Sequence, residues 1–121
     1  MGKSQQFLET GWYMRVQMFW GKGHEIVQKI NTWSEETKVG LLDLDIVSAG
    51  NGWFACSILH DGVVGERPFK CRQFVAFGIH RVAEIQEESA TWIESQRPRQ
   101  LLRVRMLTDG QDPTCLLFYV P

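Results

Sequence analysis

A chain of 121 residues that is 44% hydrophobic and 22% charged, with five Trp and seven Phe, fits one folded domain and is too apolar for a disordered protein. Its formal net charge of -1 gives no general attraction to phosphate backbones or to anionic lipid. We therefore expect neither nucleic acid nor a membrane among its partners.

The first half of the chain reads as strand, helix, strand, strand. The segment "WYMRVQMFW" (12–20) alternates apolar and polar residues, which is typical of a half-buried strand. The segment "HEIVQKINTWSEET" (24–37) places Ile26, Ile30 and Trp33 on one side of a helix of about three turns. The segments "LLDLDIV" (41–47) and "WFACSILH" (53–60), joined by "SAGNG", predict a hairpin, and "DGVVGERP" (61–68) predicts a linker.

The second half has the same order. A strand is expected at 69–77, a helix within 78–96 that ends before Pro98, and a hairpin formed by "LLRVRMLT" (101–108) and "TCLLFYVP" (114–121). The helices align at an offset of 59 residues and the hairpins at 60. We interpret residues 12–60 and 69–120 as pseudo-repeats within a single domain, 1–121.

These elements predict an α+β fold in which an antiparallel sheet of about six strands carries both helices on one face, with a pseudo-twofold axis between the halves. Neither half is large enough to be comfortably stable alone, so we expect one shared core. The residues expected in that core are Val16, Ile30, Trp33, Leu44, Ile85, Trp92, Val104 and Phe118.

The opposite sheet face is expected to mix large apolar groups with charges that are inverted between the halves. Asp43 and Asp45 occupy the positions that Arg103 and Arg105 occupy in the second half. In a face-to-face homodimer, the acidic strand of one subunit would meet the basic strand of the other. The alternatives are solvated charges, or neighbours within one chain if the two strands are adjacent.

The same face gathers groups suited to an anionic, planar ligand, because arginine binds carboxylate or phosphate and aromatic rings stack on planar groups. The set that we expect to form this ligand site or interface is Trp53, Lys70, Arg72, Phe74, Arg103, Arg105 and Tyr119, with Asp43 and Asp45. Of the two uses, an interface is favoured. The leading hypothesis is a homo-oligomer that binds a small molecule in the groove between the halves or at the dimer interface, and the alternative is a module that binds a different protein.

No pattern in the chain predicts catalysis, a metal or a cofactor. The stretch "GKGHE" (21–25) joins a strand to a helix but lacks the phosphate-binding fingerprints, so we interpret it as an ordinary turn. The three histidines lack metal-ligand spacing, and the three cysteines, Cys56, Cys71 and Cys115, are expected to be reduced, buried hydrophobes. An enzyme is therefore the third hypothesis, and the absence of a long apolar run makes cytoplasmic residence the expectation.

The doubled strand-helix-strand-strand order over residues 12–121 resembles that of the GyrI-like effector-binding domains. The resemblance implies a duplicated module that binds small molecules in the groove between its repeats. It lies in the order of elements and not in a motif, so it assigns no functional residue. A ferredoxin-like dimer is a second analogy, and neither analogy determines function.

Overall fold

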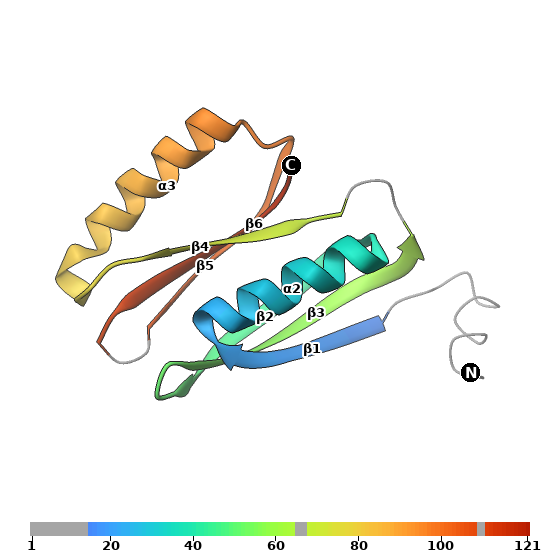
Figure 1. Ribbon diagram of the computed structural model, residues 1–121, viewed down its shortest axis with the longest axis horizontal. Helices are drawn as coiled ribbons and strands as arrows, with labels where there is room; N and C mark the ends of the chain where they lie inside the picture. Colours follow the sequence, from blue (N-terminus) through green and yellow to red (C-terminus); the bar gives the residue numbers. More distant parts are fainter. Residues whose placement is uncertain (1–14, 65–67, 109–110) are drawn as a thin grey trace.

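The computed structural model describes residues 15–64, 68–108 and 111–121. Its elements are β1 (Arg15–Lys22), α2 (Gly23–Thr37), β2 (Val39–Gly50), β3 (Trp53–Val64), β4 (Lys70–Val75), a 3-10 turn (Ile79–Arg81), α3 (Val82–Gln96), β5 (Gln100–Thr108) and β6 (Pro113–Val120). The predicted α+β class is confirmed, and each half of the chain has the order strand, helix, strand, strand (Figure 1). Residues 12–14 of the first predicted strand lie outside the described residues, and the predicted linker at 61–68 begins too early, because β3 runs to Val64.

The described strands form two three-stranded antiparallel sheets, not the single sheet of about six that was predicted. Sheet A has the order β1-β3-β2, and sheet B has the order β4-β6-β5. In each sheet the central strand is the last strand of that half of the chain, β3 in sheet A and β6 in sheet B. Apolar periodicity identifies strands but does not state which strands are neighbours, which is why the division into two sheets was not predicted.

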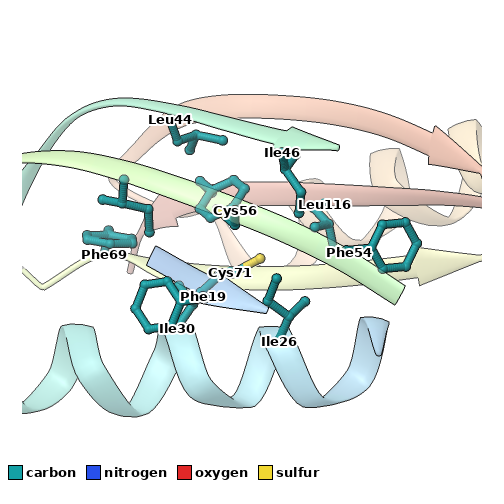
Figure 2. Close-up of a cluster of buried hydrophobic side chains, with 12 residues drawn as sticks. Phe19, Ile26, Ile30, Leu44, Ile46, Phe54, Cys56, Phe69, Cys71 and Leu116 are labelled. Carbon is teal, nitrogen blue, oxygen red and sulfur yellow. The ribbon is translucent and has the colours of Figure 1, made fainter. Parts of the chain in front are cut away.

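The two helices pack on opposite faces of sheet B, so the expectation that both share one face is wrong. Ile26 and Ile30 of α2 cluster with Cys71, Leu116 and Phe118 of sheet B, together with the inner side chains of sheet A (Figure 2). Helix α3 instead buries Ile85 against the alternate residues of the same strands, Phe74, Cys115 and Leu117. Strands β4 and β6 therefore lie between the helices (Figure 1), and β6 is apolar on both faces.

Helix α2 joins the two halves through polar contacts to the edge strand β4. The Asn31 side chain accepts a hydrogen bond from the Cys71 N–H at 2.7 Å and donates one to the Cys71 carbonyl at 3.0 Å. One turn later the buried Ser34 hydroxyl donates to the Phe69 carbonyl at 2.7 Å. These bonds satisfy backbone groups that an edge strand would otherwise leave open.

The predicted core is correct at four positions and wrong at two. Ile30, Leu44, Ile85 and Phe118 are buried, and Trp33 and Trp92 are partly buried. Val16 and Val104 are exposed instead. In β1 the apolar stripe lies on the open face and Phe19 points inward, while a β-bulge between Leu101 and Arg103 turns Val104 outward.

Candidate functional site

The structure separates the residues that the sequence grouped into one site. Lys70, Arg72, Phe74 and Tyr119 lie on the α3 side of sheet B. Arg103 and Arg105 project from the opposite face of sheet B, toward sheet A, because they pair with Phe118 and Leu116. Asp43, Asp45 and Trp53 lie on the exposed face of sheet A. The nine residues therefore do not form one binding surface.

The inverted charges meet within one chain, where the edge strands β2 and β5 lie side by side. The Arg103 Nε is 3.8 Å from the Asp43 Oδ1, and the Arg103 Nη2 donates to the Leu42 carbonyl at 3.3 Å. At the other end of this seam, the Ser48 hydroxyl donates to the Thr108 carbonyl at 2.5 Å. For Asp43 and Arg103, this is the intrachain arrangement that was the alternative to pairing across a dimer.

Each half contains a tryptophan that packs edge-on against neighbouring rings. The centroid of the Trp33 ring lies 5.5 Å from that of Phe19 and 5.1 Å from that of His60, at interplanar angles of 70° and 68°. Trp92 lies 6.0 Å from Phe74 and 4.8 Å from Tyr119, at 71° and 68°.

A cationic side chain, Arg72, also lies against the Trp92 ring. The Arg72 guanidinium lies 5.7 Å from the Trp92 ring and 5.5 Å from the Phe74 ring. Burial raises the pKa of the Tyr119 phenol, and the nearby Arg72 charge opposes that shift. Arg72 thus occupies the aromatic surface that was expected to receive a ligand.

A cavity of about 350 Å³ opens where the two halves meet. The first half contributes the end of β1, the start of α2 and the start of β3, and the second half contributes the end of β4 and the start of β6. Its lining residues are Lys22, Gly23, His24, Gly52, Phe54, Gln73, Val75, Ala76, Phe77, Asp112, Pro113 and Thr114. The volume is within the range of small-molecule sites, roughly 300–1,000 Å³.

The polar groups of this cavity come from both halves. Within the described residues, no side chain caps the start of α2, where Lys22 is the N-cap, so its first N–H groups have neither a capping side chain nor an intrahelical partner. Opposite them, the Gln73 amide donates to the Thr114 hydroxyl at 3.1 Å, and Thr114 is buried. The Asp112 carboxylate accepts the Gly78 N–H at 2.8 Å, which secures the turn after β4.

Apolar side chains form the rest of the cavity wall, which includes Phe54, Val75, Phe77 and Pro113. Gly23 lies close to Gln73, since a Cβ there would be 2.6 Å from the Gln73 Nε2 and the end of that side chain would have to move. This site was not predicted from the sequence, where "GKGHE" has the pattern of an ordinary turn. The sequence signals of this site are Gln73 and Thr114, two polar residues that share a strand face with apolar neighbours such as Cys71 and Leu116.

The thiols and the acidic groups offer little chemistry elsewhere. All three cysteines are buried free thiols, and burial raises the pKa of each, that of Cys56 to about 12. Among the described residues, no group of three or more His, Cys, Asp or Glu is placed to hold a metal ion. In the same part of the chain, neither helix is long and apolar enough to cross a membrane.

Comparisons with protein-family models, with curated proteins and with solved structures give no match for this chain.

Proposed function

We propose that this protein is a non-enzymatic binding domain that holds a small, planar, anionic molecule in the cavity between its two halves. The observation that carries the proposal is the composition of that cavity, in which an uncapped helix start and Lys22 face an apolar wall across a space of about 350 Å³. Helix N-termini and ammonium groups favour anions, while the wall suits a flat apolar body.

Two features support binding rather than catalysis. The thiols are the strongest nucleophiles in the chain, and their burial keeps them protonated near neutral pH. Three of the polar side chains in the cavity are engaged in holding the fold, since Gln73 bonds to Thr114 and Asp112 bonds to Gly78. Lys22 is left to recognise a ligand, and no cysteine is among the described residues that line the cavity.

We further propose that the two halves are duplicated repeats. The groove beside α2 is lined by Glu25, Gln28, Lys29, Thr32, Trp33 and Glu36, and the groove beside α3 by Glu84, Glu87, Glu88, Thr91, Trp92 and Ser95. Every helix position in the first groove matches one in the second at an offset of 59 residues. The flanking rings His60 and Tyr119 differ by the same offset.

This duplication supports the resemblance to GyrI-like effector-binding domains, whose ligands lie between repeats. The cavity has that position here, because both halves line it. On this view the duplication creates a site that neither half contains alone.

The test compares 2-naphthoate with its uncharged counterpart 2-naphthamide by calorimetric titration of the full chain. We expect naphthoate to bind roughly fivefold more tightly, which corresponds to about 1 kcal/mol from the helix terminus and the lysine. Val75→Asp, which places a carboxylate in the cavity wall, should abolish naphthoate binding, and Val104→Asp should not. The two valines are matched controls, since both lie in strands and are 48% and 55% exposed.

Two results would contradict the proposal: no saturable binding of naphthoate, or equal effects of the two aspartate substitutions.

A further inference from the structure

The outer face of sheet A, which points away from α2, carries an apolar ridge on the edge strand β1. Val16, Met18 and Trp20 are 55%, 58% and 63% exposed on this face. They alternate with Phe19, which faces the core. The more apolar side of β1 is therefore the side that faces away from the core.

A hollow lies beside the ridge. The strand pairing sets Met18 and Trp20 next to Ser57 and Ala55 in the centre of the sheet, and these small residues in turn pair with Asp45 and Val47 on β2. The resulting depression of about 270 Å³ is walled by the large residues on both sides, and its lining includes Met18, Trp20, Asp45, Val47, Ala55 and Ser57.

The size of this face fits a specific interface. Its five exposed apolar side chains, Val16, Met18, Trp20, Val47 and Trp53, each leave about half of their area open, which amounts to roughly 500 Å² of apolar surface. That is near the upper limit for a patch on a monomer. A standard interface buries roughly 800 Å² per partner, so these apolar side chains would supply more than half of that area.

We propose that this face binds the same face of a second copy of the chain, so that the β1 ridge of each copy enters the hollow of the other. A ridge and a hollow side by side on one surface are self-complementary, because a twofold axis between them places the ridge of each copy over the hollow of the other. The twofold axis lies between β1 and β3, so that β1 of one copy lies over β3 of the other.

This inference does not depend on the ligand cavity, which lies at the junction of the two halves. It also differs from a dimer held by Asp–Arg pairs, because Arg103 contacts Asp43 within the chain. The arginines of β5 have no part in the proposed interface.

The first test is sedimentation velocity of the full chain over a range of concentrations, with two matched methionine variants. Met18→Lys should weaken dimerisation by roughly 10- to 100-fold, the loss expected when a buried apolar side chain is replaced by a charge. Met106→Lys should leave it unchanged, since Met106 is exposed to a similar extent, 50%, but lies on sheet B. Circular dichroism of both variants checks that each remains folded.

The second test places a charge in the hollow. Ala55→Lys should weaken dimerisation, because Ala55 lines the hollow that the partner's ridge enters. A wild-type protein that sediments as a monomer at 100 µM, or a dimer that Met18→Lys and Met106→Lys weaken equally, would overturn the proposal. A complex in which this face binds a different protein while the chain alone stays monomeric would also overturn it.

Discussion

Asn31 links the two halves of the chain through two hydrogen bonds to Cys71, and replacing it with alanine should be costly. The change removes both hydrogen bonds to Cys71 and leaves a backbone N–H and a carbonyl of β4 without a partner at a buried position. Each unsatisfied group costs about 1–3 kcal/mol, and the higher helix propensity of alanine returns about 0.5 kcal/mol. We expect Asn31→Ala to lower the free energy of unfolding by about 2–4 kcal/mol.

The measurement is urea unfolding followed by tryptophan fluorescence. The control is Gln28→Ala, an exposed position on the same helix, where we expect a change within about 0.5 kcal/mol. Both substitutions are made in a Met18→Lys background, so that any self-association does not contribute to the apparent stability. Equal midpoints for the two alanine variants would refute the assigned role of Asn31, and two separate unfolding transitions would contradict a single domain.

Three further predictions follow from burial and exposure. The three thiols should not react with 5,5′-dithiobis(2-nitrobenzoate) at pH 8 in the folded protein and should all react in urea. Rapid labelling without urea would contradict their burial. Folding raises the pKa of Cys56 from 9.0 to about 12, so its thiol ionises at lower pH in the unfolded chain than in the folded one. The free energy of unfolding should therefore not depend on this group below pH 9 and should fall as the pH rises from 9 toward 12. Arg103→Met should lower the free energy of unfolding by less than about 1 kcal/mol, because the Arg103–Asp43 pair is largely exposed. A loss of several kcal/mol in the same urea assay would show that the seam contributes more than its exposure indicates.

Local patterns were sufficient to predict most of the elements. The stripe of Ile26 and Ile30 predicted α2, and the alternation of Leu44 and Ile46 with two aspartates predicted both β2 and its buried side. Such signals depend on residues two to four positions apart, which the sequence displays directly.

The candidate cavity depended on contacts between distant segments. Gly23 and Gln73 come together only because α2 lies against β4, and neither residue carries a recognisable motif. The seam between β2 and β5 has the same origin, since it joins residues sixty positions apart.

The sequence by itself determined the class of fold, the order of the elements and the helix faces, because these depend on local periodicity. Only the tertiary structure decided which side of each strand is covered. Strand β1 has apolar residues on both sides, and its longer stripe is the exposed one, because α2 packs on the side of Phe19. The central strand β6 of sheet B is covered on both faces, on one by α2 and sheet A and on the other by α3, so alternation could not distinguish an inner from an outer face there. The physical reason is that a period of two assigns residues to two faces, whereas the packing of distant elements determines which face is removed from water.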